Sequence, residues 1–332
     1  MWYNRRKEGN MKIGIVGSGS IVNEALPLLS ECGWEPAAMC GTKRSFEKVQ
    51  RICREYSMEY ASCDYVQFLQ QKSFDIVYIA VPNHLHYVMT KQALEAGKHV
   101  ILEKPVTTKY EEAKELAELA RERNLFLFEA ISTLYLPNYG KLKEWLPEVG
   151  EVKIVSCNFS QYSRRYDRFK QGEILPVFDP KNAGGALMDL NVYNLHYVVE
   201  LFGAPKRISY LPNIERDIDT SGVLTLQYDT FQAVSIAAKD CSAPCSYVIQ
   251  GTKGYLMQAT PANSCGEIVL RKNDGTEKRF DASPAHRLMS EFRLFAKEIG
   301  SGNRVFCYQQ LEHTLIVADL LTRVCSDKMK HE

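Results

Sequence analysis

The stretch Gly97–Thr108, GKHVILEKPVTT, decides the fold of the amino-terminal half of the chain. Within it, Val100–Leu102 is a short apolar run that predicts a buried strand ending at Glu103. Pro105 has no N–H to give to a sheet ladder, so the chain leaves the sheet at this point. Lys104 is therefore expected at the carboxyl end of a buried strand, where open α/β sheets bind their ligands. A lysine in that place can be catalytic or can pair with a carboxylate, and the stretch alone leaves both open.

A helix is predicted directly after this stretch. Thr108 and Glu111 have the spacing of a capping box, so we expect the helix to begin at Thr108. Its buried face repeats at the i, i+3, i+4, i+7 spacing of an amphipathic helix, in Ala113, Leu116, Ala117 and Ala120.

The same strand–helix alternation runs through residues 1–130. Phe74–Val81 is almost continuously apolar, which is typical of a strand buried on both faces of a parallel sheet. Alternation with short turns predicts right-handed crossovers and a doubly wound, Rossmann-type parallel sheet. The other strands are expected at Lys12–Val16, Pro36–Cys40 and Leu125–Phe128.

The turn after the first strand begins a dinucleotide-binding fingerprint. Its first glycine allows the tight turn, and its second lets the backbone approach a pyrophosphate. The helix that follows offers its free N–H groups to phosphate. Val22 replaces the third glycine, which predicts a wider gap between helix and strand. We expect a cofactor to contact Gly17, Ser18, Gly19, Ser20 and Ile21.

The turn after the second strand predicts which dinucleotide binds. NAD-binding chains usually place an acid there for the ribose hydroxyls, but no acid stands between Glu35 and Glu47. A hydroxyl and two cations suit a 2′-phosphate instead, since a guanidinium binds a phosphate with two hydrogen bonds. The alternative is a solvated basic face, because three more cations follow at helical spacing. We expect NADP(H) in preference to NAD(H), bound through Thr42, Lys43 and Arg44.

A third group of cofactor contacts is expected after the strand at 74–81. Asn83 can donate to the cofactor and His86 can line the cleft, although Asn83 is also a plausible helix N-cap. Together with residues of the opening stretch, the expected set is Pro82, Asn83, His86, Glu103 and Lys104.

Composition excludes several classes of function. Charged residues make up 24% of the 332 residues and nearly cancel to +1, so no global field recruits nucleic acid or an anionic membrane. No apolar run approaches the roughly 20 residues that span a bilayer. The ten cysteines lack paired CxxC spacings, which predicts reduced thiols and no metal site. Met1–Asn10 is polar and lacks a signal-peptide core, so we expect a loose extension on a cytoplasmic protein that acts on a small molecule.

Short alternating segments dominate from Glu151 onward and predict an antiparallel sheet. We therefore expect a cofactor-binding domain at residues 1–130 and a substrate-binding, oligomer-forming domain at residues 131–332. The long loop Gln161–Asp179 is either a substrate-facing lid or a mobile solvent loop. The strands are expected at Val152–Asn158, Ile208–Ile214, Val223–Tyr228, Ala233–Ala237 and Tyr247–Gln250.

One helix of this second half, Leu187–Phe202, has a polar stripe. Asp189, Tyr193, His196 and Glu200 fall at i, i+4, i+7 and i+11, on the side opposite the apolar set. This stripe is either part of a site or a hydrogen-bonded surface, and the spacing leaves both open. Two closing helices are expected at Ala285–Ile299 and Gln310–Ser326. His286 and Arg287 can either reach the cleft or begin the first of these helices, and we expect the helix start.

Four motifs give the chain a resemblance to the glucose–fructose oxidoreductase/inositol dehydrogenase/MocA family: VPNHLHY (81–87), ALEAGKHVILEKP (93–105), LFLFEA (125–130) and GGALMDLNVYNLH (184–196). In its motifs the chain is most similar to the dihydrodiol dehydrogenase-like members. The resemblance implies a Rossmann domain followed by an α+β domain with a large, mostly antiparallel, open-faced sheet. It also implies a homodimer or homotetramer formed through that sheet. Leu134 and Asn191 depart from the family pattern, which usually has Arg and Gly at these places.

The resemblance also implies roles for site residues in an NADP(H)-dependent oxidoreductase of sugars, polyols, diols or related carbonyl compounds. Lys104 would lie beside the nicotinamide, lower the pKa of Tyr193 and hold the substrate oxygen, while Tyr193 moves the proton. Asp189 would orient Lys104 or a substrate hydroxyl. The alternative is a catalytically silent NADP(H)-binding regulator or scaffold of the same fold. The expected substrate contacts are Tyr162, Arg164, Asp189 and His196.

Overall fold

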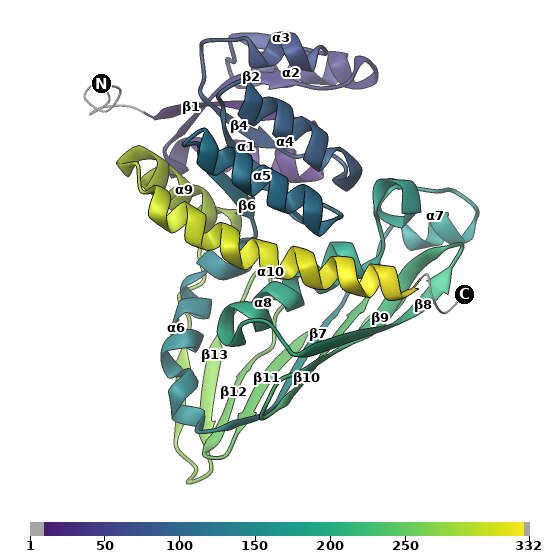
Figure 1. Cartoon of the computed structure of the whole chain (residues 1–332), viewed down its shortest axis with the longest axis vertical. Helices are drawn as coiled ribbons and strands as arrows, with labels where there is room; N and C mark the ends of the chain where they lie inside the picture. The colour runs from purple at the N-terminus through teal and green to yellow at the C-terminus, as the bar shows by residue number, and fades with distance from the viewer. Residues whose placement is uncertain (1–9, 329–332) are drawn as a thin grey trace.

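The computed structural model describes residues 10–328, so all but the last residue of the expected loose extension lies outside the described residues. Its amino-terminal part is a parallel sheet with the strand order β3-β2-β1-β4-β5-β6, drawn at the top of Figure 1. This is the doubly wound order of a Rossmann fold, which confirms the prediction. The strands are β1 (Met11–Val16), β2 (Trp34–Cys40), β3 (Tyr60–Ser62), β4 (Ile76–Ile79), β5 (His99–Glu103) and β6 (Leu127–Ala130).

Helices lie between these strands: α1 (Ser20–Leu29), α2 (Phe46–Glu55), α3 (Tyr65–Leu69), α4 (His86–Glu95) and α5 (Tyr110–Glu122). The predicted start of α5 is wrong, because the helix begins at Tyr110 and Thr108 makes no cap. The N–H of Tyr110 donates instead to Thr322 Oγ1, 2.8 Å away in the last helix of the chain. A hydroxyl from a distant element therefore does what the capping box was expected to do.

The second sheet has the strand order β14-β13-β12-β11-β7-β10-β9-β8. Within the described residues, β7 and β10 pair in parallel and the other neighbours pair antiparallel, which confirms a mostly antiparallel sheet. Sequence reasoning placed five of its strands and missed the last three. They are β7 (Val152–Ser160), β8 (Arg207–Glu215), β9 (Ile218–Gln227), β10 (Gln232–Ala238), β11 (Ser246–Gly251), β12 (Gly254–Gln258), β13 (Ile268–Lys272) and β14 (Glu277–Phe280).

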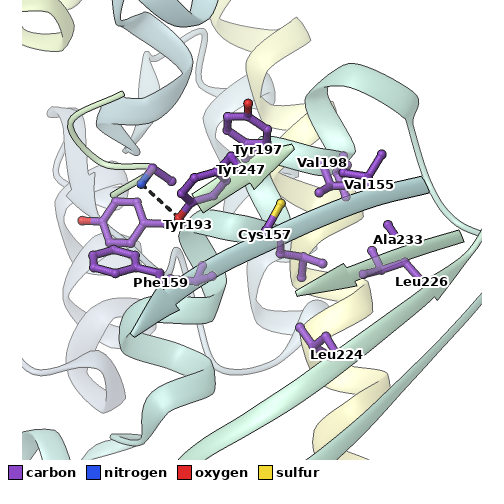
Figure 2. Packing of buried hydrophobic residues seen from close by; sticks show 14 of the residues in the cluster. Val155, Cys157, Phe159, Tyr193, Tyr197, Val198, Leu224, Leu226, Ala233 and Tyr247 are labelled. Carbon is purple, nitrogen blue, oxygen red and sulfur yellow. Dashed lines mark hydrogen bonds between the residues drawn. The ribbon is translucent and has the colours of Figure 1, made fainter. Parts of the chain in front are cut away.

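Helices cover one face of this sheet. The helices of the second half are α6 (Pro137–Trp145), α7 (Tyr166–Lys170), α8 (Val192–Phe202), α9 (Leu288–Ser301) and α10 (Arg304–Lys328), with a π-helical turn, Leu187–Asn191, leading into α8. Figure 2 shows the core that forms between α8 and the inner face, with Val155 and Cys157 of β7 opposite Val198. Among the helices of residues 10–328, none is both long and apolar enough to cross a bilayer.

The last two helices join the two sheets. Phe292 and Phe295 of α9 pack into the core of the parallel sheet, against Tyr78 and Phe128. α10 then runs across the junction, where it contacts α5, β6 and α8 (Figure 1). Residue 130 remains our proposed end of the cofactor-binding domain, although α9 and α10 return to it.

Candidate active site

A cavity of about 760 Å³ opens where the two halves of the molecule meet. Its floor is formed by the carboxyl ends of β1, β2, β4 and β5, through Gly17, Gly41, Val81 and Lys104. β1 lies between β2 and β4, so the cavity is at the point where the strand order reverses. Doubly wound sheets bind dinucleotides at this point. Tyr193 and other residues of the carboxy-terminal half form the opposite wall.

The glycine turn of this cavity fits a dinucleotide. Gly17 has a φ of +108°, and a Cβ added there would lie 2.0 Å from the carbonyl oxygen of Ala80. Gly19 precedes the first turn of α1, and a Cβ added there would meet nothing within 4 Å. The open space before a helix N-terminus, with its free N–H groups, suits a phosphate. The five predicted residues of the turn, Gly17, Ser18, Gly19, Ser20 and Ile21, all line the cavity.

The turn after β2 presents hydroxyls to the same cavity. Thr42 caps a short 3-10 turn by accepting the Ser45 N–H at 3.2 Å, and both side chains line the cavity. Lys43 and Arg44 are exposed on this turn and are not part of the cavity wall. Lys48 is the first of the three cations whose helical spacing left a solvated basic face open as the alternative. It donates to the Ser18 carbonyl and so connects α2 to the glycine turn.

Lys104, Asp189 and Tyr193 come together at the other end of the cavity. Lys104 Nζ lies 3.1 Å from Asp189 Oδ1, 3.0 Å from the Asp189 carbonyl oxygen and 4.8 Å from the centre of the Tyr193 ring. The second carboxylate oxygen of Asp189 accepts from Lys239, whose side chain is only 4% exposed. Asp189 therefore sits between two ammonium groups, one from each half of the molecule.

These charges set the protonation states of the cluster. Burial raises the pKa of Asp189, but the charges of Lys104 and Lys239 outweigh it and hold that pKa well below its usual range. Burial lowers the pKa of Lys104, but the neighbouring Tyr193, Asp189 and Glu103 raise it overall. Burial raises the pKa of Tyr193, and the Lys104 charge offsets this only in part. At neutral pH the cluster is a carboxylate, an ammonium and a protonated phenol.

The Tyr193 phenol is held by the start of its helix. Asp219 of β9 accepts the Leu187 N–H at 2.7 Å, which fixes the π-helical turn before α8. The Tyr193 ring packs 6.1 Å from the Phe159 ring, and its hydroxyl points away from the core (Figure 2). Asn191, at the position where the resemblance implies a glycine, is buried and accepts a hydrogen bond from Ser235 Oγ.

Some expected cofactor contacts lie elsewhere. His86 is fully buried, with Nδ1 2.7 Å from the Pro105 oxygen and Nε2 2.9 Å from the Val81 oxygen, and it does not line the cavity. Asn83 donates to the Ala183 oxygen at 2.9 Å. A 3-10 turn after Pro82 rotates His86 inward, so these side chains join two turns instead of facing the cleft. Pro82 and Glu103 do line the cavity.

The expected substrate contacts are corrected in the same way. His196 is fully buried, and its Nδ1 lies 2.9 Å from Nε2 of His313. Every residue of α8 from Val192 to Val199 is buried, so the helix has no solvent-facing side over this length. The predicted polar stripe is therefore wrong beyond Tyr193. Tyr162 donates to Asp167, and neither Tyr162 nor Arg164 lines the cavity.

The loop at 161–179 contributes other residues. It contains α7 and its own small core of Tyr166, Phe169 and Phe178, so it is not an open loop. Gln161 and Arg165 of this segment line the cavity.

Two further residues, one lining the cavity and one paired with Asp189, were not assigned to the site from the sequence. Arg287, for which a helix start was preferred over a place in the cleft, lines the cavity and donates to Glu24 at 2.8 Å. Lys239 follows the apolar strand β10 with no motif around it, so only the register of β10 brings it to Asp189. All ten cysteines are free thiols, and within residues 10–328 no group of three or more His, Cys, Asp or Glu is arranged to hold a metal ion.

Comparison with known proteins places the chain in a family. Residues 11–130 match a family model described as "Oxidoreductase family, NAD-binding Rossmann fold", and residues 140–257 match the GFO/IDH/MocA C-terminal domain. A scyllo-inositol 2-dehydrogenase (NADP(+)) of Bacillus subtilis, IolU, is 35% identical over 235 residues, which cover 70% of this chain and 71% of that protein. A D-xylose 1-dehydrogenase (NADP(+)) of Hypocrea jecorina is 35% identical over 267 residues, 74% of this chain and 68% of that protein.

Solved structures agree. KijD10, a 3-ketoreductase from Actinomadura kijaniata in complex with NADP and TDP-benzene, superposes with a TM-score of 0.83 at 26% sequence identity. The match covers 96% of this chain and 98% of that one. The chain belongs to the GFO/IDH/MocA family of oxidoreductases.

Proposed function

We propose that this protein is an NADP(H)-dependent oxidoreductase that transfers a hydride between the nicotinamide and a sugar, polyol, diol or related carbonyl substrate. The observation that carries the proposal is the position of Lys104 Nζ, 4.8 Å from the Tyr193 ring, in the cavity that also holds the glycine turn. An acid–base pair and a dinucleotide cradle in one cavity are what a carbinol–carbonyl conversion needs.

The protonation states of Tyr193, Lys104 and Asp189 indicate what each residue does in the reaction. The cofactor, when bound, supplies or accepts the hydride at the reacting carbon. In the reducing direction Tyr193 gives its proton to the carbonyl oxygen, which suits a phenol whose pKa is raised by burial. Lys104 stabilises the negative charge that develops on this oxygen and on the phenolate. In the oxidising direction Tyr193 must first lose its own proton to solvent, and the phenolate then takes the substrate hydroxyl proton as the hydride leaves the carbon. Asp189, held ionised, orients Lys104 and transfers no proton.

The choice of NADP(H) is supported by the turn after β2. Thr42 and Ser45 line the cavity there, the turn carries no carboxylate, and Lys43 and Arg44 are adjacent. Lys48 is fixed on the same side by its bond to Ser18. The two relatives at 35% identity are both named as NADP(+) enzymes.

A polyhydroxylated substrate is supported by the polar groups near Tyr193. Gln161, Arg165, Asp189 and Asn263 all line this cavity and can bond to hydroxyl groups. The relatives named above act on an inositol and on a pentose by their names.

We also propose that the protein forms a homodimer or homotetramer through the open face of its second sheet. On that face Leu211 of β8 is 67% exposed and Ile154 of β7 is 46% exposed. Val234 and Ile236 of β10 lie between these strands and are half-buried. Exposed apolar side chains on a sheet face that no helix covers are typical of a protein–protein interface.

A substrate panel tests the proposed function. The purified protein is incubated with sugars, inositols and diols plus NADP⁺ or NAD⁺, and with the matching carbonyl compounds plus NADPH, while absorbance at 340 nm is followed. We expect turnover of at least one panel member, with kcat/KM at least about tenfold higher for NADP(H) than for NAD(H). Tight NADPH binding by fluorescence titration without turnover of any member would instead support the silent regulator.

A further inference from the structure

A chain of ionisable side chains, buried at its inner end, runs from behind the turn that carries Lys104 toward the surface, and the proposed reaction does not use it. Glu129 stands near the end of β6 and is only 4% exposed. His196 of α8 follows, then His313 of α10, and Glu200 of α8 ends the chain by pairing with Lys143 of α6. Buried charges are costly to keep, so a chain of this length calls for a role.

Glu129 contacts both elements that carry the proposed catalytic pair. Its Oε1 accepts the Val106 N–H at 2.7 Å, two residues after Lys104. Its Oε2 lies 3.5 Å from Nε2 of His196, which is one helical turn after Tyr193. The same oxygen accepts from Thr314 Oγ1 of α10 at 2.7 Å. One carboxylate therefore connects the Lys104 turn, the Tyr193 helix and the helix that joins the two halves.

The two histidines suit the task of holding this carboxylate. Nδ1 of His196 lies 2.9 Å from Nε2 of His313, so one proton is shared between these two nitrogens. Burial lowers the pKa of His313 to about 3, which makes His313 the neutral partner and the acceptor. Nδ1 of His313 then carries its proton toward Glu200, 3.4 Å away. Nε2 of His196 faces Oε2 of Glu129 at 3.5 Å and, within the described residues, makes no hydrogen bond to any other group.

The state of Glu129 agrees with this arrangement. Burial alone raises the pKa of its carboxyl, but the His196 charge and the hydrogen bonds from Thr314 and Val106 bring it below the usual range. Glu129 is therefore an ionised acceptor, and its bond to the Val106 N–H is a charge-assisted one.

We propose that Glu129 is a positioning residue, which fixes Lys104 against Tyr193 through the Val106 N–H while His196 and His313 hold its carboxylate in place. The inference rests on the proposed function for its catalytic part. Without the carboxylate, the Val106 N–H loses its acceptor and the turn that carries Lys104 can shift. A displacement of about 1 Å at a reacting group costs about a hundredfold in rate.

Kinetics of three variants test the proposal with NADPH and the best carbonyl substrate of the panel. Glu129→Ala is expected to lower kcat at least about tenfold, while KM and the NADPH dissociation constant stay within about threefold. Glu129→Gln is expected to keep kcat within about threefold of the wild type, because its amide oxygen still accepts from Val106. Glu298→Ala removes an equally buried carboxylate of α9, bonded to Asn303, and is expected to leave kcat unchanged. Equal loss in Glu129→Ala and Glu298→Ala would overturn the proposal.

Amide hydrogen exchange of the segment 104–109 keeps the test independent of turnover. We expect faster exchange in Glu129→Ala and wild-type exchange in Glu129→Gln and Glu298→Ala. Unchanged protection in Glu129→Ala would overturn the positioning role, whatever the activity. If Glu129→Ala loses amide protection at 104–109 but the wild type turns over no member of the panel, the proposed function is wrong and the positioning of this segment by Glu129 still holds.

Discussion

Asp189 accepts hydrogen bonds from two lysines that reach it from different sheets, Lys104 after β5 and Lys239 after β10. Lys104 is only 13% exposed and Lys239 only 4%, so neither charge is well hydrated. The Asp189 carboxylate is the counter-charge of both buried ammonium groups, and without it each would be an uncompensated buried charge. The single carboxylate therefore stabilises both the fold and the cluster beside Tyr193.

Asp189→Asn is expected to lower the free energy of unfolding by about 3 kcal/mol, because it leaves two buried cations facing each other without a counter-charge. Adding Lys239→Met should recover part of this loss, since it removes one of the unpaired charges. Thermal or denaturant unfolding of the single and double variants measures both effects. A double variant less stable than Asp189→Asn alone would contradict this account of the cluster.

The cofactor turn gives a second prediction at this scale. Arg44→Ala is expected to weaken NADPH binding about tenfold and to leave NADH binding unchanged, because a guanidinium bonds to the 2′-phosphate that only NADPH has. Fluorescence titration with both cofactors measures the difference. Arg54→Ala, at the other end of α2, is the matched control and should change neither affinity. Equal weakening of both cofactors by Arg44→Ala would show that Arg44 does not select between them.

Some residues of the site could be predicted from a short stretch of sequence, and others depend on contacts between distant elements. Lys104, Asp189 and Tyr193 could be predicted because each belongs to a motif at a strand end or helix start. Lys239 could not, since its place beside Asp189 depends on how β10 pairs with β7 and β9. His196 was misplaced for the opposite reason: its spacing from Tyr193 suggested a shared face, but α10 packs over that side of α8.

At the scale of elements, apolar runs located the strands that are buried on both faces of the parallel sheet, whereas β12, β13 and β14 of the second sheet were missed. β4 and β5 are almost wholly buried, so their apolar runs predicted them. β14 has the sequence EKRF and is mostly exposed, which leaves no periodic signal. The start of α5 was misplaced because its first free N–H finds an acceptor in α10, a partner that no local pattern reveals.

The amino end of β5 predicts a pH effect on stability. His99 accepts the Phe126 N–H at 3.1 Å, and burial, aided by the Arg304 charge, lowers the pKa of His99 to about 4. The unfolded chain binds a proton at this histidine near pH 6.5, so its contribution to stability is lost as the pH falls from about 6.5 toward 4. In His99→Gln the fall of the melting temperature between pH 7 and 4 should be shallower than in the wild type.

His84 supplies the control for that experiment. It is exposed on the turn before α4, so His84→Gln should melt with the same pH dependence as the wild type. Parallel curves for the wild type and His99→Gln would show that protonation of His99 does not oppose folding.

At the scale of the whole molecule, α9 and α10 make the two sheets one unit, and the site lies at their junction (Figure 1). The cavity needs both halves, because the glycine turn comes from one and Tyr193 from the other. The helix-covered face of the second sheet packs against α8, which carries Tyr193 to the junction. Its opposite face, with Leu211 and Ile154 exposed, is the one we propose as the subunit interface.

Light scattering after size-exclusion chromatography tests that interface. The wild type is expected to elute as a dimer or tetramer and Val234→Glu as a monomer, because the new carboxylate would be buried without a partner at the centre of the face. Val66→Glu places the same charge on α3, where the side chain is 59% exposed, and should leave the mass unchanged. A monomeric wild type at micromolar concentration would contradict the proposed assembly.

The most direct test of the central claim is single-turnover oxidation of NADPH by the wild type, Tyr193→Phe and Lys104→Met with the best carbonyl substrate. Tyr193→Phe removes the proton donor and Lys104→Met removes the charge beside it, whereas the glycine turn is untouched. We expect the rate of hydride transfer to fall at least about a hundredfold in each variant, with NADPH affinity within about threefold of the wild type. Hydride transfer at the wild-type rate in either variant would contradict the account.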